Sequence, residues 1–326
     1  MQKITNTDKL IGGVSVSSNI FLGAGVVKDP LVKELPDYIG LRDLVGMVTI
    51  GSVTPQARNG NTGKLNWPKT YGHYSKYSLE GGLHANGMRN LGIKETLENL
   101  PKESNIPIAV SLAGYSVLDY VGGLQEILKH KNASLLSAVE INCSCPTMGS
   151  APMAYSLETL SELFKEIRKT KSDKPLWFKL SPYFTEEAIS DLHVKYPKYN
   201  FNKSPIINVS FIADLCGLLK QNQDVVSAII VSNGLPGVFR GHNISVNKDS
   251  GIIDNGGGLS GKLLKENNLA TIRLLRSHGV VSDIIGCGGV LGRKDIDDYI
   301  SAGAQAVQAA GGPVWGGGPL FFKNFN

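Results

Sequence analysis

Two short segments near the C-terminal end of the chain decide the fold: Ile284-Ile-Gly-Cys-Gly-Gly289 and Ala306-Val-Gln-Ala-Ala-Gly-Gly312. Each begins as an apolar run of the kind that forms a buried parallel strand, and each ends in two glycines. Between them, apolar residues at helical spacing from Asp295 to Ile300 predict a helix that Gly303 ends. A strand, a helix and a second strand in this order predict a parallel pair with a right-handed crossover.

The same pattern recurs toward the N-terminus. Six further apolar runs end in Gly, Ser, Asn or Cys, at residues 19–23, 45–50, 108–112, 138–142, 176–180 and 228–231. Helical patterns separate several of them, for example after the capping residues Ser156 and Thr185 and from Leu263 to Leu275. Eight strands that alternate with helices predict a (β/α)8 TIM barrel rather than an open sheet. We find no repeat, linker or low-complexity tract, so residues 1–326 are predicted to form a single domain.

In such a barrel the carboxyl ends of all strands open on one face, where active sites lie. The longest connections, residues 51–107 and 232–283, are expected to overhang that C-terminal face as lids or substrate walls. Within the second, the run Gly256 to Gly261 could close over a ligand or form a hinge, and spacing favours neither. The glycines that end strands seven and eight are placed to hold a phosphate with backbone N–H groups. The alternative is that they only permit tight turns.

Two residues on or beside the strands, Cys145 and Lys179, are candidates for chemistry. In the segment Asn142-Cys-Ser-Cys-Pro-Thr147, strand alternation sends Cys143 to the side opposite Asn142. Cys143 is therefore expected to be a small apolar filler, whereas Cys145, which follows the strand, is equally well a filler or a proton-accepting thiol. Lys179 lies inside an apolar strand, where a buried ammonium needs a carboxylate or an electron-rich ligand. The alternative is a lysine that reaches the rim.

Composition excludes several classes of protein. The net charge of +5 has no basic block, so nucleic acid is not an expected partner, and no apolar run reaches the ~20 residues of a membrane span. The first ten residues lack the apolar core of a signal peptide. Four cysteines without a CxxC pair fit a reduced, cytoplasmic protein better than a disulfide scaffold. No spacing of His, Asp and Glu matches a metal site, so no metal is predicted.

Taken together, these segments resemble the dihydroorotate dehydrogenase family of FMN-containing barrels over nearly the whole chain. The Lys-Leu-Ser-Pro-Tyr-Phe stretch, and the absence of an N-terminal membrane-binding extension, look most like the soluble class with a cysteine base. The segments that match are residues 19–25, Gly87-Met-Arg-Asn-Leu-Gly92, Asn142-Cys-Ser-Cys-Pro146, Lys179-Leu-Ser-Pro-Tyr-Phe184, Gly257-Gly-Leu-Ser-Gly261, Ile285-Gly-Cys-Gly-Gly289 and Ala302-Gly-Ala-Gln-Ala-Val-Gln308.

The resemblance implies an FMN site across the barrel mouth. Lys179 would contact the pyrimidine side of the isoalloxazine and stabilise the negative charge of the reduced flavin. The remaining contacts would come from backbone or hydroxyl groups. The implied cofactor-binding residues are Ala24, Gly25, Ser52, Lys179, Gly261, Gly288, Gly289, Gly311 and Gly312.

The resemblance also implies a reaction. Cys145 would take a proton from C5 of dihydroorotate while hydride passes from C6 to flavin N5, which gives orotate for pyrimidine biosynthesis. Asn142 and Asn233 would hydrogen-bond the substrate ring. The other implied substrate-binding residues are His84, Gly87, Met88 and Thr147. The expected partner is a dihydropyrimidine-like small molecule, and relatives are commonly homodimers.

Several positions depart from the family pattern. Gly51 replaces a lysine that usually follows strand two, His84 and Thr147 replace two of four substrate asparagines, and Gly234 replaces a Ser or Thr. These changes leave open a flavin oxidoreductase with another small-molecule substrate, or a barrel that binds flavin without turnover. Retention of Cys145 and Lys179 opposes the last alternative.

Overall fold

The barrel predicted from the sequence is present in the computed structural model, which describes residues 9–27, 44–60, 82–84, 87–145, 152–240 and 257–311. Within these residues, eight parallel strands close on themselves because the last strand pairs with the first. In order around the barrel they are β3 (Ile20–Val27), β4 (Met47–Val53), β6 (Ile108–Leu112), β7 (Ala138–Asn142), β8 (Leu176–Lys179), β10 (Ala228–Val231), β13 (Asp283–Cys287) and β14 (Ala306–Ala309).

The first two barrel strands are longer than the apolar pattern predicts. The pairing of β3 with β4 shifts register between Leu22 and Val27, and that of β4 with β6 shifts between Gly51 and Val53. Ala24, Gly25 and Ser52 therefore lie within irregular strand ends, which corrects their predicted place beyond the strands. The irregular backbone nevertheless keeps all three at the C-terminal face of the barrel.

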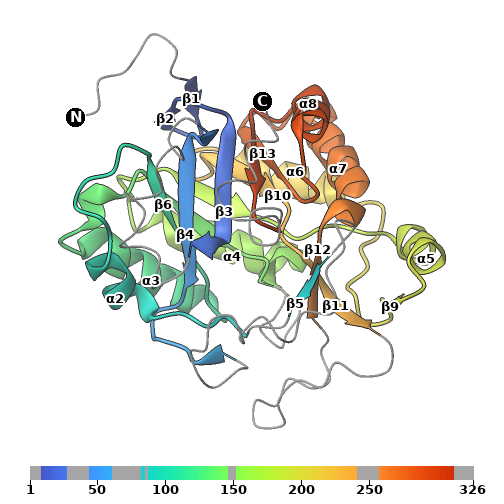
Figure 1. Cartoon of the computed structure of the whole chain (residues 1–326), viewed down its shortest axis with the longest axis horizontal. Helices are drawn as coiled ribbons and strands as arrows, with labels where there is room; N and C mark the ends of the chain where they lie inside the picture. Colours follow the sequence, from blue (N-terminus) through green and yellow to red (C-terminus); the bar gives the residue numbers. More distant parts are fainter. Residues whose placement is uncertain are drawn as a thin grey trace.

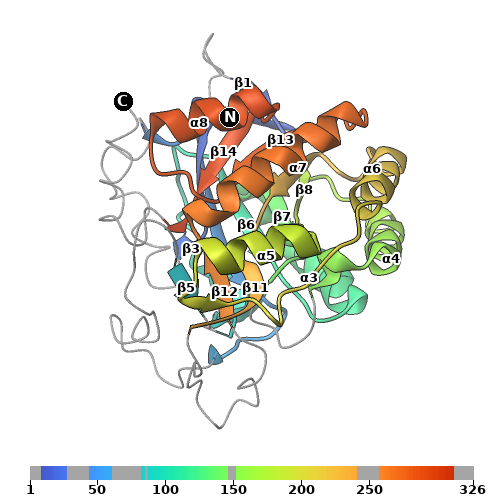
Figure 2. The same ribbon diagram turned by 90° about the vertical axis from the view of Figure 1, so that its right-hand side faces the viewer.

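Helices pack around the outside of the barrel (Figures 1 and 2). The predicted caps are confirmed: the Ser156 hydroxyl accepts from the N–H of Thr159, the Thr185 hydroxyl accepts from the N–H of Ala188, and Gly303 is left-handed. The helices are α2 (Gly92–Glu98), α3 (Val117–Lys129), α4 (Leu157–Arg168), α5 (Glu186–Lys195), α6 (Phe211–Gln221), α7 (Lys265–Ser277) and α8 (Arg293–Ala302). Short 3-10 turns are η5 (Ala133–Leu135), η6 (Met153–Tyr155) and η8 (Lys262–Leu264).

Two antiparallel additions were not predicted. A hairpin of β1 (Lys9–Ile11) and β2 (Val14–Val16) covers the N-terminal end of the barrel, and a four-stranded sheet lies at the opposite end (Figure 1). The order of that sheet is β5 (Gly82–His84), β12 (Gly257–Ser260), β11 (Leu235–Arg240) and β9 (Tyr199–Asn200). The glycine run is therefore a buried strand from Gly257 to Ser260, which corrects its interpretation as a hinge or a closing loop.

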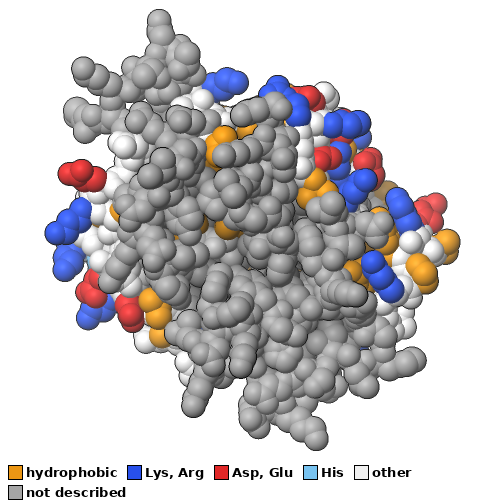
Figure 3. Space-filling view, in the orientation of Figure 1, with side chains coloured by type: hydrophobic (Ala, Val, Ile, Leu, Met, Phe, Trp, Pro, Cys, Tyr) orange, Lys and Arg blue, Asp and Glu red, His pale blue; other side chains and the backbone are white. Residues whose placement is uncertain are grey.

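On the face drawn in Figure 3, the described side chains at the margin carry charges of both signs. Around the visible margin in Figure 3, Lys and Arg side chains lie among Asp and Glu side chains. In the part of the chain that the structure describes, no helix is long and apolar enough to cross a bilayer.

An apolar plug fills the N-terminal half of the barrel, next to the β1–β2 hairpin. The indole of Trp177 stacks on Phe21 with ring centroids 5.7 Å apart, and its Nε1 donates to the backbone oxygen of Gly12 at 2.8 Å. Both rings are fully buried, together with hairpin residues such as Val16. The plug closes the N-terminal end of the barrel, so a ligand can enter the interior only from the C-terminal face.

We expect Trp177→Ala to lower the free energy of unfolding by about 3–5 kcal/mol, because it removes the ring at the centre of the plug. Urea unfolding of the apoprotein measures this change. Leu118→Ala is the control, since the Leu118 side chain is 81% exposed and its loss should change stability by no more than about 0.5 kcal/mol. Equal effects of the two variants would contradict the plug.

Candidate functional site

A layer of polar side chains lies next to the apolar plug, on the side of the C-terminal face. Successive inward-facing residues of a strand are two apart, so the residues that follow the plug by two positions form the next level of the interior. On five of the eight strands these residues are polar and buried, at 4% exposure or less: Thr49, Ser111, Glu140, Lys179 and Gln308. The layer occupies one side of the barrel, where β14, β4, β6, β7 and β8 supply these side chains and β3, which lies between β14 and β4, supplies Gly23.

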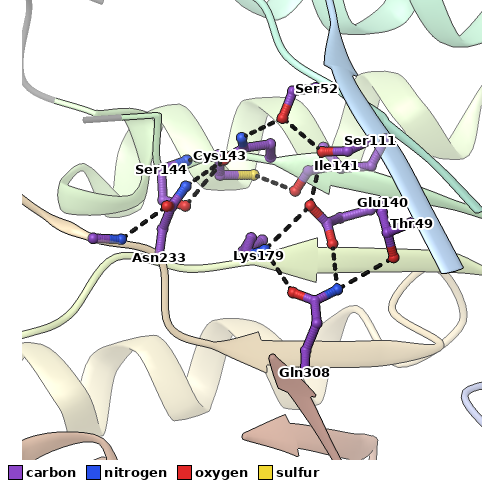
Figure 4. A network of polar contacts seen from close by, with 12 residues as sticks. Thr49, Ser52, Ser111, Glu140, Ile141, Cys143, Ser144, Lys179, Asn233 and Gln308 are labelled. Carbon is purple, nitrogen blue, oxygen red and sulfur yellow. Dashed lines mark hydrogen bonds and ion pairs between the residues drawn. The ribbon is translucent and has the colours of Figure 1, made fainter. Parts of the chain in front are cut away.

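Lys179 is the cation of this layer. Its ammonium donates to Oε1 of Gln308 at 2.6 Å and lies 3.5 Å from Oε1 of Glu140 (Figure 4). The side chain is 4% exposed, so the expectation of a buried lysine with a carboxylate partner is confirmed, and the alternative of a lysine at the rim is wrong. The predicted contact of Lys179 with a cofactor stays a prediction.

Glu140 and Gln308 are site residues that the sequence analysis missed. Oε2 of Glu140 accepts from Nε2 of Gln308 at 3.0 Å, and Oε1 accepts from the Ser111 hydroxyl at 2.7 Å. Room for Gln308 comes from Gly23, because a Cβ there would lie 2.9 Å from Cγ of Gln308. For Glu140 a signal was available, because it is the single charged residue in the apolar strand Ala138–Asn142, and the same kind of signal identified Lys179.

A chain of hydrogen bonds leads from this layer to the asparagines at the mouth. The Ser111 hydroxyl is 2.8 Å from the Ser52 hydroxyl, which accepts from Nδ2 of Asn142 at 2.8 Å (Figure 4). Oδ1 of Asn142 accepts from Nδ2 of Asn233 at 3.0 Å and from the Ser144 hydroxyl. The structure thus brings together Ser52, Asn142 and Asn233, which the sequence analysis selected separately.

The two cysteines after this strand line the same cavity, but only Cys143 also belongs to the apolar core cluster. Cys143 packs in the apolar core, and burial raises the pKa of its thiol far above the usual range, which agrees with its predicted role as a filler. Cys145 is 6% exposed and lines a cavity of about 280 Å³ together with Cys143 and with Tyr115, Tyr120 and Tyr155. The Tyr120 hydroxyl donates to the backbone oxygen of Asn142, so this cavity adjoins the asparagines. The four cysteines, all within the described residues, form no disulfide.

The predicted phosphate-binding glycines form two loops in contact. Gly288, Gly289 and Gly261 all have positive φ, and a Cβ on Gly289 would lie 2.8 Å from Cα of Lys262. Side chains hold these loops: the Tyr299 hydroxyl donates to the oxygen of Gly288 at 2.7 Å, and Nδ2 of Asn268 donates to that of Cys287 at 2.7 Å. Only glycine fits this crowded, left-handed backbone, as a backbone-lined anion site requires.

A second buried lysine lies beside these loops. Lys265 lies at the start of α7, and its ammonium donates to the carboxylates of Asp295 and Asp298, which both belong to α8. Lys265 and Lys294 together lower the pKa of Asp298 to about 2. This cluster ties α7 to α8 next to the glycine loops, and both of its carboxylates are engaged by lysine, so it serves as a support for the loops.

The remaining predicted residues divide into placed and undescribed ones. Gly87 and Met88 have positive φ, and Nδ2 of Asn90 donates both to the Met88 oxygen at 2.7 Å and to the hydroxyl of Thr54, which directly follows β4. Gly311 is half-buried beyond β14, and Ala24 is half-buried in β3. The backbone of His84 pairs with Gly258, but its side chain, and the whole of Thr147 and Gly312, lie outside the described residues.

The donor set of this face fits a flavin mononucleotide. A Cβ on Gly25 would meet nothing within 4 Å, which leaves open space at the end of β3, and the glycine loops of β12 and β13 lie at the same face as the ammonium of Lys179. A flat ring system with an anionic edge and a phosphate would match this combination. Among the described residues, no group of three His, Cys, Asp or Glu side chains could hold a metal ion.

Fold and site define a parallel α/β barrel with a charged, hydrogen-bonded interior and glycine loops at its mouth. A sequence profile of dihydroorotate dehydrogenase matches residues 9–324. The chain therefore belongs to the dihydroorotate dehydrogenase family, whose members depend on a flavin, generally FMN.

Known proteins of this family match most of the chain at low identity. The catalytic subunit of dihydroorotate dehydrogenase B (NAD(+)) from Enterococcus faecalis is 30% identical over 284 residues, which are 84% of this chain and 76% of the relative. Dihydroorotate dehydrogenase A (fumarate) from Limosilactobacillus reuteri is 29% identical over 235 residues, 70% and 65% of the two chains. The crystal structure of the Eimeria tenella enzyme in complex with ferulenol shares the fold, with a TM-score of 0.67 at 17% identity over 98% of this chain and 82% of that one.

We expect Gly289→Ala to raise the Kd for FMN about tenfold or more, since its Cβ would overlap the backbone of Lys262 and displace the loop. Fluorescence titration of the apoprotein with FMN measures this. The matched control is Gly292→Ala, because Gly292 has extended φ and open space around its Cβ position, so its Kd should stay within about twofold. A normal Kd for Gly289→Ala would remove this loop from the FMN site.

Proposed function

We propose that this protein is an FMN-dependent oxidoreductase that oxidises dihydroorotate to orotate in pyrimidine biosynthesis, with Cys145 as the base. The observation that carries the proposal is the hydrogen-bonded chain that links the buried ammonium of Lys179 to Asn142 and Asn233. A cation at one end and paired amides at the other suit a flavin edge and a dihydropyrimidine ring in one site.

Each group of residues has a distinct task in this proposal. Bound FMN supplies the hydride acceptor, and the backbone of Gly261, Gly288 and Gly289, together with Gly311 and Gly312, would hold its phosphate. Lys179 provides positive charge beside the flavin, while Asn142 and Asn233 orient the substrate ring. An unpaired amide at such a site costs about 1–3 kcal/mol, so a ring that matches both asparagines is preferred over one that does not.

Two observations support Cys145 as the base in this proposal. It follows Asn142 by three residues and lies in a cavity that adjoins this asparagine. Its thiolate would remove a proton from C5 of the substrate and pass it to water.

One observation favours a second candidate, an enzyme of the same family with another dihydropyrimidine substrate. Gly51 stands where the family usually has lysine; its φ is +111°, and a Cβ there would lie 2.9 Å from the oxygen of Ser111. A side chain at this position would be strained, so the backbone is built without the usual cation. A substrate that lacks the carboxylate of dihydroorotate would not need that cation.

Anaerobic reduction of the bound flavin tests the proposal and separates the two candidates. We expect dihydroorotate to bleach the flavin absorbance at least about tenfold faster than dihydrouracil, which lacks the carboxylate. The reverse order would support the second candidate. FMN-loaded protein that no dihydropyrimidine bleaches would overturn both and would favour a barrel without turnover.

Cys145→Ser should slow flavin reduction by the substrate at neutral pH about 100-fold or more, because a hydroxyl is a much weaker base than a thiolate. The Kd for FMN should stay unchanged. Stopped-flow absorbance gives the rate, with Cys143→Ala as the control for loss of a neighbouring thiol that packs in the core. A normal rate in Cys145→Ser would assign the proton to another group.

We further propose that the chain acts as one domain, as a homodimer and in the cytoplasm. The mixed charges of the described surface support a small molecule rather than nucleic acid as its partner.

A further inference from the structure

Glu140 is the residue at which the two halves of the site meet. Its carboxylate is fully buried and contacts three side chains: Lys179 at 3.5 Å, Ser111 at 2.7 Å and Gln308 at 3.0 Å. An ionised carboxylate without partners is costly in a barrel interior, so these contacts are required for it to stand there.

We propose that Glu140 is a positioning residue for the reaction, which fixes the ammonium of Lys179 on one side and the amide of Asn142 on the other. This inference rests on the proposed function. Glu140 itself lies beneath the mouth, next to the plug, and would touch neither flavin nor substrate. It would act through the residues that do.

Toward Lys179, the carboxylate acts together with Gln308. Oε1 of Gln308 accepts from the ammonium while its Nε2 donates to Glu140 and, at 3.3 Å, to Thr49. Both ends of the amide are thus engaged, and the three side chains form a closed triangle that holds the ammonium in one place. The carboxylate also balances the charge of the ammonium, so it would moderate the field that Lys179 exerts on a bound flavin.

Toward the substrate, the carboxylate acts through two hydroxyls. The Ser111 hydroxyl donates to Glu140, so its oxygen is free to accept from the Ser52 hydroxyl at 2.8 Å. The oxygen of Ser52 accepts in turn from Asn142. The direction of every donor in this chain is set by the carboxylate, because a carboxylate can only accept. It therefore decides which atom of Asn142 faces Ser52 and leaves its Oδ1 toward Asn233.

Thermal unfolding of the apoprotein tests the pair without the cofactor. Glu140→Gln and Lys179→Met should each lower Tm, because each leaves one buried charge without its partner. The double variant should unfold no lower than the worse single variant, so the two losses are far from additive. Asp283→Asn is the control, since Asp283 accepts from the N–H of Gly12 at the opposite end of the barrel and its effect should add to that of Lys179→Met.

Reduction potentials of the FMN-loaded variants, measured against a reference dye, test the effect on the flavin. Glu140→Gln should make the flavin easier to reduce, with about a tenfold higher ratio of reduced to oxidised flavin at a fixed potential, because Lys179 is no longer balanced. Lys179→Met should shift the ratio in the opposite direction. A purely structural carboxylate would leave the ratio unchanged.

Ser111→Ala separates the two directions of the proposal. This variant removes the hydroxyl that connects Glu140 to Ser52 and Asn142, but it keeps the ion pair of Glu140 with Lys179. The KM for the substrate should therefore rise about fivefold, while the ratio of reduced to oxidised flavin stays unchanged. Additive Tm losses in the apoprotein, or an unchanged ratio in Glu140→Gln, would overturn the inference. Protein that binds no FMN would instead overturn the proposed function, and the apoprotein measurements would still decide the role of Glu140.

Discussion

The structure depends on one buried ion pair, between Lys179 and Glu140, in the middle of a closed barrel. Two charges removed from water are costly, and their mutual attraction offsets this cost only when the remaining donors and acceptors are satisfied. Gln308, Ser111 and Thr49 supply those partners, each from a different strand. The pair is therefore compatible only with a barrel whose strands are in this register, and the register in turn brings Asn142 within reach of Ser52.

The two-residue repeat of a strand explains why a hydrophobic plug and a charged site can share one barrel. On β8, Trp177 and Lys179 face the same interior, one below the other, and on β7 Ala138 and Glu140 do the same. The large ring of Trp177 closes the N-terminal end of the barrel and excludes water there. Solvent can therefore screen the charges of Lys179 and Glu140 only from the C-terminal face. Electrostatic contacts with a bound ligand are stronger in such surroundings than at an open surface.

The sequence predicts the eight barrel strands because buried parallel strands are continuous apolar runs, which are visible one at a time. It does not predict the antiparallel sheet at the mouth, since strands of two to six residues pair across long distances: Ser260 and Gly82, 178 positions apart, are in contact. The same difference applies to the site. Lys179 is identified as a charge in an apolar strand, but its link to Gln308 depends on which residues share a level around the barrel. The glycines at the ends of β12 and β13 have the positive φ and close packing that demand glycine, and their predicted role in holding a phosphate stays a prediction.

The balance of charge in the polar layer bears on substrate choice. Lys179 and Glu140 carry opposite charges within 3.5 Å, so among the described residues of this layer the net charge is zero. Gly51 cannot restore a cation by simple substitution, because its φ and the nearby oxygen of Ser111 leave no room for a side chain. An anionic substrate must then find its countercharge in groups above the barrel rather than inside it. In the proposed function, the charge-balanced interior would therefore hold the ring and the flavin without selecting for a charged substituent on the ring.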